Sequence, residues 1–361
     1  MQINRRDFLM ATAGLALSGC LPTSTKQLKQ SWFVSAASDS DGNHFTVAVD
    51  FNGKLISKVA LPERGHDVLP IPNKPGHAFV IARRPDRYLL EIDFRTGDVV
   101  QQTESDADSH FYGHGRLIEN GRYLLTSENQ FDSGKGMIVV RDAQKLWVLD
   151  RFESGGIGPH DMAMLPNGKT LVVANGGIKT HPDYHRIKLN LDEMAPNLSY
   201  IDVNSGRVLA SYQPEHHQQS IRHLNVRNDG KVFLALQYQG NKQDIVPLIY
   251  AHHGEEHLQP FIAPDSQWRS MNQYTASVLA HGEHVAVSCP RGGTFTLWNA
   301  ESRQFEQSIP MTDVAGLCAS DGHLMASTGH GKLYKQALSS TDNIQMHNIR
   351  FDNHMAVVRA S

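Results

Sequence analysis

A short pattern that recurs six times along this chain constrains its fold more than any other feature. Each copy contains an apolar segment, a turn with Gly or Asn-Gly, a second apolar segment and a polar loop, as in HDMAMLPNGKTLVVANGG from His160. The copies begin at His66, His114, His160, His223, Thr275 and Ala315. Alternating polarity and turn residues predict a β-hairpin in each copy. Two weaker strands lie between copies, for example at 137–142 and 147–153, and four antiparallel strands make one blade of a β-propeller.

The two ends of the chain together supply one more blade. Residues 352–358 repeat the first strand of the pattern, and the chain then ends. The missing strands are found near the other terminus, at 32–37, 44–51 and 54–61. Closing a blade with both termini removes the open sheet edge that would otherwise invite aggregation. We therefore expect an all-β fold, a seven-bladed β-propeller over residues 32–361. The longest step between copies leaves room for an insertion at about 177–197.

The first twenty residues are typical of an export signal rather than of folded structure. Arg5 and Arg6 precede a weakly apolar stretch at 8–17, which is too short to span a hydrocarbon core of about 20 residues. The paired arginines resemble the twin-arginine signal, and residues 17–20 resemble a lipobox ending in Cys20. We expect twin-arginine export, lipidation of Cys20, a tether at 21–31 and a periplasm-facing protein held at a membrane by lipid. The alternative is that Cys20 is an ordinary residue near a soluble cleavage site.

Charge and cysteine content exclude two classes of protein. The net charge is -3 with both signs well mixed, so the sequence lacks the basic footprint of a nucleic-acid-binding protein. Apart from Cys20 the chain has only Cys289 and Cys318, which excludes a disulfide framework and leaves room for one bridge. We expect a monomer.

Five of the seven blade-starting positions are histidines: His66, His114, His160, His223 and His354. The register is supported independently by turn glycines, because Gly121, Gly230, Gly282 and Gly322 each follow their blade start at the same spacing. Since the innermost strands line the central channel, these histidines should form a ring at one mouth. A lone histidine is more often a solvated or hydrogen-bonded residue, but five in one register predict a metal or anion site.

The residue types around this ring suggest which metal it would hold. Imidazoles bind Zn, Cu, Fe and Ni, and a site with few carboxylates disfavours Ca²⁺ and Mg²⁺. A bound histidine needs an acceptor for its second ring nitrogen. The second strands return to the same mouth, so Glu128 and Asn175 are candidate acceptors, and Glu128 is also a candidate ligand. Cys289 is either a soft ligand or, more commonly for such a cysteine, a small buried residue.

Further candidates lie next to the ring. His110 precedes an inner strand, and His181 lies in the insertion where it could cap the mouth, although a Pro-Asp turn explains it equally well. Arg64 and Arg222 each lie near a ring histidine and could bind an anionic ligand, with pairing to a nearby acid as the alternative.

Several motifs together resemble a known family. They are Arg64-Gly65-His66, His110-Phe111-Tyr112-Gly113-His114-Gly115, Gly156-Ile157-Gly158-Pro159-His160-Asp161, Val173-Ala174-Asn175-Gly176-Gly177-Ile178, Thr180-His181-Pro182-Asp183 and Ser220-Ile221-Arg222-His223-Leu224. Across the mature chain they resemble an uncharacterised bacterial family of twin-arginine-exported seven-bladed propellers, a domain of unknown function. Its members are often encoded beside imelysin-type periplasmic proteins and iron-regulated genes. The resemblance therefore implies a role in iron acquisition or handling and an imelysin-type partner, without catalytic residues to carry over.

Three classes of function follow from these expectations. The leading one is a periplasm-facing protein that binds a transition metal at the histidine ring, with iron favoured. Copper is next, because central histidines hold copper in nitrous-oxide-reductase-like propellers, an analogy of fold alone. The alternatives are a metal-dependent hydrolase, lactonase or oxidoreductase at the same mouth, and a protein-interaction scaffold. No Ser-His-Asp signature or phosphate loop supports a specific reaction.

Overall fold

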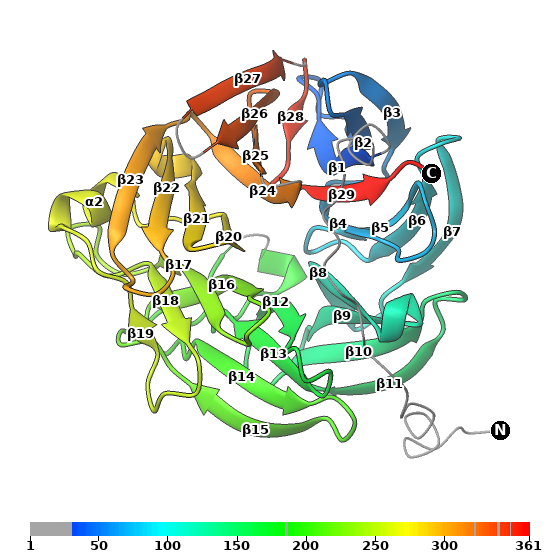
Figure 1. The fold of residues 1–361 in the computed structure, drawn as a ribbon. Helices are drawn as coiled ribbons and strands as arrows, with labels where there is room; N and C mark the ends of the chain where they lie inside the picture. The colour runs from blue at the N-terminus through cyan, green and yellow to red at the C-terminus, as the bar shows by residue number, and fades with distance from the viewer. Residues whose placement is uncertain (1–30, 185–186, 321–322, 338–339, 347) are drawn as a thin grey trace.

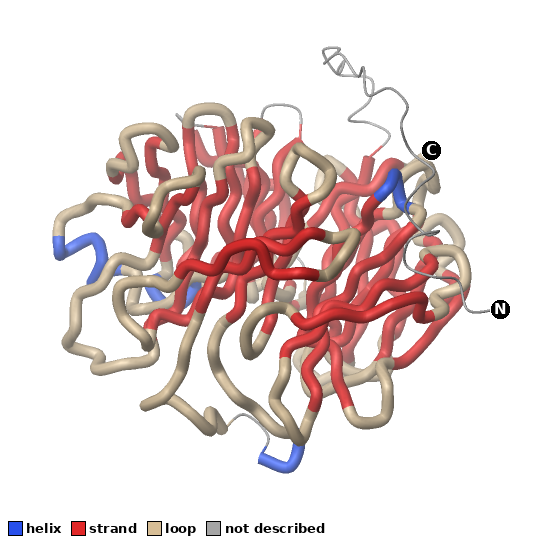
Figure 2. The backbone as a smooth tube through the Cα atoms, turned by 90° about the horizontal axis from the view of Figure 1, so that it is seen from below, coloured by secondary structure: helices blue, strands red, loops and turns tan. Residues whose placement is uncertain are grey.

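A computed structural model describes residues 31–184, 187–320, 323–337, 340–346 and 348–361. Seven antiparallel sheets are arranged in a ring around a central channel, which confirms the predicted seven-bladed β-propeller (Figure 1). Seen from the side, the strands run between two faces formed by loops (Figure 2). The predicted signal peptide, Cys20 and the tether up to residue 30 lie outside the described residues. Within the described part of the chain, no helix is long and apolar enough to cross a membrane.

Six blades are contiguous in sequence and contain four strands each. The first contains β4 (Gly65–Pro70), β5 (His77–Ala82), β6 (Tyr88–Asp93) and β7 (Asp98–Glu104). The second contains β8 (Ser109–Ile118), β9 (Tyr123–Gln130), β10 (Gly136–Asp142) and β11 (Val148–Glu153). The third contains β12 (Pro159–Met164), β13 (Thr170–Asn175), β14 (Asn197–Asp202) and β15 (Arg207–Tyr212).

The next three blades continue around the ring. The fourth contains β16 (Gln219–Val226), β17 (Val232–Tyr238), β18 (Ile249–His252) and β19 (Gln259–Pro260). The fifth contains β20 (Ser277–His281), β21 (His284–Cys289), β22 (Thr294–Asn299) and β23 (Phe305–Pro310). The sixth contains β24 (Val314–Ser320), β25 (His323–Thr328), β26 (Lys332–Ala337) and β27 (Ser340–Met346). The described helices are short: η1 (Glu119–Gly121), η2 (Pro182–Tyr184), α2 (Asp265–Ser270) and η3 (Pro290–Gly292).

Both termini build the seventh blade, as predicted. Strands β1 (Ser31–Ser38), β2 (His44–Asp50) and β3 (Leu55–Ala60) come from the N-terminal part of the chain. The inner position is shared by β28 (Arg350–Phe351) and β29 (Ala356–Arg359), which both pair with β1. Strand β1 begins at Ser31, which pairs with Arg359. The predicted tether therefore includes one residue too many, because Ser31 already belongs to the sheet.

The core lies between neighbouring blades and not in the channel. The second strands are buried over most of their length, and β5 and β13 over all of it, because both of their faces are covered by adjacent blades. The outermost strands, such as β11, remain largely exposed. One buried cluster joins Val34 of the seventh blade, Val80 of the first and Leu124 of the second. At roughly 25 cal/mol per Å² of buried apolar surface, these contacts between blades are the main stabilising term.

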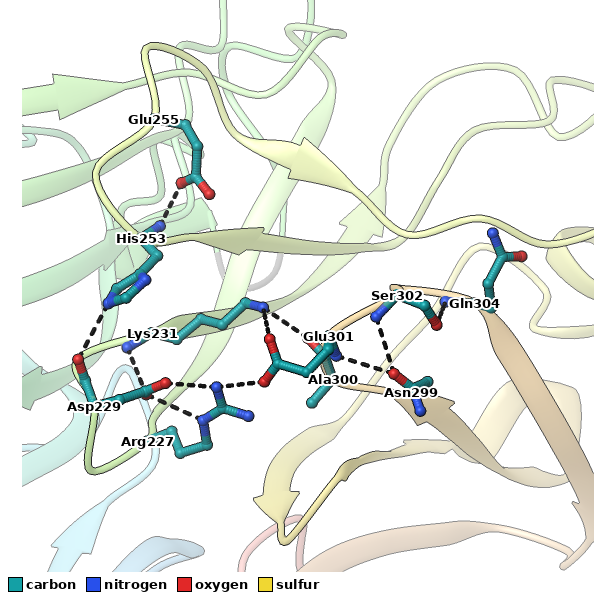
Figure 3. A network of polar contacts seen from close by, with 10 residues as sticks. All are labelled: Arg227, Asp229, Lys231, His253, Glu255, Asn299, Ala300, Glu301, Ser302 and Gln304. Carbon is teal, nitrogen blue, oxygen red and sulfur yellow. Dashed lines mark hydrogen bonds and ion pairs between the residues drawn. The ribbon is translucent and has the colours of Figure 1, made fainter.

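A polar network links the fourth and fifth blades at their loops (Figure 3). Arg227 lies in the turn between β16 and β17, 2.5 Å from Asp229 and 2.6 Å from Glu301, which follows β22. Lys231 lies 3.1 Å from Glu301. Because Glu301 is mostly exposed, solvent screens these charges, and such pairs typically contribute less than about 1 kcal/mol each. The network orients the loops more than it stabilises the ring.

The inner strands are irregular where the blade-starting histidines lie. Pairing with the second strand shifts between Gly65 and Val68 around His66, and between Phe111 and Gly115 around His114. Similar shifts lie at or next to His160 and His223, and residues 352–355 separate β28 from β29 around His354. The expectation that each histidine begins its strand is therefore wrong for His114 and His223. Strands β8 and β16 begin several residues earlier, and the histidines lie at the bulges that follow.

Candidate metal centre

Five imidazoles from five different blades meet in the central channel: His66, His114, His160, His223 and His354. His114 lies in the middle of the cluster. Its ring centre is 4.9 Å from that of His66 and 4.9 Å from that of His160. It is 5.4 Å from the ring centre of His223 and 4.5 Å from that of His354. The structure thus brings together all five ring positions that the sequence singled out.

The cluster contains two overlapping groups with the spacing of a metal site. One is His66, His114 and His354, and the other is His114, His160 and His223; within each group the ligand atoms lie within 4.8 Å of one another. Two nitrogens bound to one ion at about 2.0–2.1 Å lie at most about 4 Å apart. Small side-chain rotations would therefore bring the three nitrogens of either group to metal-binding distance. His114 belongs to both groups, which makes it the residue on which either site depends.

The bulges explain how a strand can direct so many side chains inward. Neighbouring residues of a regular strand point to opposite faces, whereas a bulge adds a residue and redirects its side chain. At the largest of these bulges Gly113 has a φ of +111°, and a Cβ there would lie 2.4 Å from Cδ2 of His66. Glycine is required at this position both by its backbone conformation and by the close approach of His66.

Three buried or nearly buried carboxylates surround the imidazoles: Asp67, Asp161 and Asp352. Nδ1 of His66 lies 3.3 Å from Asp352. Nδ1 of His114 lies 3.6 Å from Asp67 and 3.7 Å from Asp161. Nδ1 of His223 lies 3.9 Å from the other oxygen of Asp161. Carboxylates in this position orient metal-binding imidazoles and increase their basicity.

Sequence reasoning missed these three acids, although a signal was present. Asp67 and Asp161 directly follow ring histidines, and Asp352 lies two residues before His354. In regular strands the residue after a channel-facing histidine points away from the channel. Because the bulges cancel that alternation, both members of the His66-Asp67 pair and of the His160-Asp161 pair reach the cluster.

Four of the imidazoles are held in the neutral form that binds metals. Burial lowers the pKa of His66 to about 4, although the hydrogen bond with Asp352 opposes the shift. Burial, together with the other imidazoles, also moves three more pKa values well below the usual 6.5, those of His160, His223 and His354. Their lone pairs are therefore available at neutral pH without the loss of a proton.

His114 differs from the other four. Burial lowers its pKa, but the negative charges of Asp161 and Asp67 outweigh that effect and raise the pKa above its usual value. Burial would also raise the pKa of Asp67, yet the nearby imidazole of His114 holds that pKa well below its usual range. Without a metal, His114 is thus the imidazole of the cluster that most favours the protonated form.

The unpaired nitrogens of the cluster fit a metal ion. Nε2 of His114, Nδ1 of His160 and Nε2 of His354 are buried, and within the described residues they have no hydrogen-bond partner. A buried polar atom without a partner costs about 1–3 kcal/mol, and a coordinated cation would remove that penalty. The donor set is mainly imidazole, which suits borderline divalent metals such as Zn, Cu, Fe and Ni.

A pocket of about 410 Å³ lies over the cluster, and His66, His160 and His223 form part of its wall. His110 and His181 also line it, outside the cluster itself. The ring of His110 stacks against those of Tyr112 and Phe131, and its Nδ1 lies 2.8 Å from the carbonyl oxygen of Phe111. His181 comes from the predicted insertion between β13 and β14, and its Nδ1 also accepts a hydrogen bond at 3.3 Å from the backbone N–H of Asp183, in the turn that was the alternative explanation.

Both predicted anion-binding arginines line the same pocket. Arg64 pairs with Asp352 at 2.5 Å. The alternative interpretation of Arg64, pairing with a nearby acid, is therefore what the structure shows. Arg222 lies at the bulge beside His223 and is 8% exposed. Burial lowers its pKa from the usual value. Sequence reasoning did not single out Arg84, a further cation of this pocket.

Three other candidates are engaged elsewhere. Glu128 accepts a hydrogen bond at 2.8 Å from the buried guanidinium of Arg141. Asn175 exchanges hydrogen bonds with Ser154 and neighbouring residues of its own blade. Cys289 packs in an apolar cluster, and burial raises the pKa of its thiol, which disfavours the thiolate needed for metal binding. Cys289 and Cys318 are both free thiols.

Comparison with known proteins extends the fold assignment. Hydrazine synthase of Kuenenia stuttgartiensis superposes with a TM-score of 0.58 at 14% identity, covering 88% of this chain and 92% of that one. At this identity the likeness concerns the fold alone. No curated protein matches the chain. A family model does match, over residues 59–358, and its description is a protein of unknown function, DUF1513. Because the match covers most of the chain, including all five clustered histidines, the protein belongs to the DUF1513 family.

Proposed function

We propose that this chain is a metal-binding propeller that holds a transition-metal ion in its histidine cluster. The observation that carries the proposal is the convergence of five imidazoles from five blades, with buried nitrogens that have no partner among the described residues. Three carboxylates behind the rings supply the acceptors that bound imidazoles need. Iron is the favoured metal, supported by the resemblance to propellers encoded with iron-regulated genes, and copper is next.

The setting we propose is iron acquisition or handling on the periplasmic side of a bacterial membrane. Its support is the N-terminal sequence, with Arg5 and Arg6 as the twin-arginine signal and Cys20 as the lipidated residue. The proposed partner is an imelysin-type periplasmic protein, and the proposed state is a monomer. In cell fractionation, replacing both arginines by lysine should retain the protein in the cytoplasm, and Cys20→Ala should release it from membranes. Unchanged fractions for both variants would contradict this setting.

The metal proposal is tested by elemental analysis of the untagged protein, as purified and after loading with Fe, Cu and Zn. We expect about one metal per chain in the wild type. His114→Ala should lose it, because His114 belongs to both candidate groups. His66→Ala should retain a weaker site, because His114, His160 and His223 remain. His217→Ala, which replaces an exposed histidine, is the matched control. Metal retention by His114→Ala equal to that of the wild type would overturn the proposal.

The affinity for metal should depend on pH in a defined direction. Protons compete with the metal for imidazole nitrogens, and the raised pKa of His114 strengthens that competition. We therefore expect affinity to fall as the pH drops below about 6. Competition titrations with a metal-sensitive dye at several pH values would measure this, and an affinity unchanged at pH 5 would argue against imidazole ligands.

A further inference from the structure

The pocket over the histidine cluster is positively charged on a chain whose net charge is -3. Its lining contains four arginines: Arg64, Arg83, Arg84 and Arg222. Among the lining residues that the structure describes, Asp86 is the one carboxylate. The buried Asp352 pairs with Arg64 and Arg83, which leaves Arg84 and Arg222 facing a lining whose one carboxylate is Asp86. A concave, cationic pocket of about 410 Å³ has the size and charge that suit a small anionic molecule.

Arg222 is the strongest indication of what this pocket binds. Its side chain lies in the pocket wall and is more than nine-tenths buried. Its Nε and Nη1 atoms have no hydrogen-bond partner in the described part of the chain. Buried guanidinium N–H groups without an acceptor cost free energy, and oxyanion groups that accept hydrogen bonds from them remove that cost.

The surrounding backbone leaves room for this guanidinium. A Cβ on Gly176 would lie 2.9 Å from Nη1 of Arg222. Arg84 approaches the same region from the loop after β5, with its guanidinium 5.6 Å from the ring centre of Tyr112. Tyr112 itself lies beside the cluster, 6.2 Å from the ring centre of His160. Arginines from two separate elements therefore face one pocket that opens onto the imidazoles.

We propose that this pocket binds a small polyanion bearing carboxylate or phosphate groups, held by Arg222 and Arg84, with one of its oxygens completing the coordination of the metal. The anion site stands on the arginines alone, and its link to the metal rests on the proposed function. His66, His160 and His223 are shared by the pocket and the cluster, so an anion in the pocket lies next to a metal in the cluster. The site would then take up a metal as its anionic chelate.

The test is calorimetric titration of the metal-free protein with citrate and, separately, with inorganic phosphate. We expect at least one probe to bind, and the tighter one identifies the source of the anionic groups. Arg222→Gln and Arg84→Gln should each weaken binding by about tenfold or more, because each removes a charge-assisted hydrogen-bond donor. Arg207→Gln, on the exposed outer strand β15, is the matched control. Thermal unfolding of each variant checks that it is folded, and Arg84, which is only half-buried, gives an informative variant if Arg222→Gln is unstable.

A second titration separates this inference from the proposed function. Loading the wild type with metal should tighten anion binding by about tenfold, a gain that should be lost in His114→Ala. If the wild type retains no metal, the proposed function fails while the metal-free titration still tests the anion site. The anion proposal is overturned if neither probe binds, or if the two arginine variants bind both probes as tightly as the wild type does.

Discussion

The histidine cluster should make the metal-free protein sensitive to acid, and His66 allows the effect to be calculated. Burial lowers the pKa of His66 to about 4 in the folded chain. In the unfolded chain an imidazole titrates near the usual value of about 6.5. Between these values the unfolded state binds a proton that the folded state does not. The contribution of His66 is therefore constant above about pH 6.5, and folding stability falls as the pH drops from there towards 4.

The size of the loss follows from the two pKa values. At pH 5 the unfolded imidazole is almost fully protonated and the folded one almost fully neutral, which lowers the free energy of unfolding by about 2 kcal/mol. His66 is 3% exposed, so solvent screens this effect little. A glutamine at this position is polar and cannot titrate. The stability of the wild type relative to His66→Gln should therefore decrease by about 2 kcal/mol between pH 7.5 and pH 5.

Urea unfolding followed by tryptophan fluorescence at both pH values measures this difference. Comparing two proteins at each pH cancels the titration of the shared groups that do not interact with residue 66. His217→Gln serves as the control, because its side chain is exposed in the folded protein and should show no comparable change. If the stability of the wild type relative to His66→Gln is the same at pH 7.5 and pH 5, then His66 does not remain neutral on folding and the reasoning is refuted.

Two further predictions concern a buried ion pair and a glycine next to the histidine cluster. Removing the carboxylate in Glu128→Ala should lower the free energy of unfolding by about 3–5 kcal/mol, because Arg141, which is 2% exposed, is left without its partner. In urea unfolding, the double replacement Glu128→Gln/Arg141→Met should recover much of the lost free energy of unfolding. If Glu128→Ala unfolds within about 1 kcal/mol of the wild type, the ion pair does not stabilise the fold as reasoned. Gly113→Ala should reduce metal retention to about the level of His66→Ala in elemental analysis and cost about 1–3 kcal/mol of stability, because its Cβ would displace His66. In Gly168→Ala, where φ is also positive but a Cβ would meet nothing within 4 Å, metal retention should be normal; equal retention in both variants would contradict the role given to Gly113.

The propeller could be predicted from the sequence because its units are local. Each hairpin is specified by alternating apolar residues around a turn, and these signals need no information from distant parts of the chain. The count of seven blades and the closure by both termini followed from that repeat. Even the membership of the histidine cluster followed, since residues in the same position of successive blades must surround the same axis.

What surrounds the histidines depended on the tertiary structure. Asp352 approaches His66 across 286 residues of sequence, and that contact exists only because the last blade closes against the first. The bulges that bring Asp67 and Asp161 inward break the alternation on which strand prediction relies. Glu128 was a candidate acceptor or metal ligand by its position at the end of a second strand. In the structure its carboxylate forms an ion pair with Arg141 of the same blade instead.

The sequence by itself thus determined the fold and the residues that share the axis, because both follow from local repetition. Only the tertiary structure decided which nitrogens have no partner, which acids stand behind them and which arginines gather in one pocket. Those features depend on side-chain directions at irregular backbone positions and on contacts between blades, which a pattern along one chain does not encode.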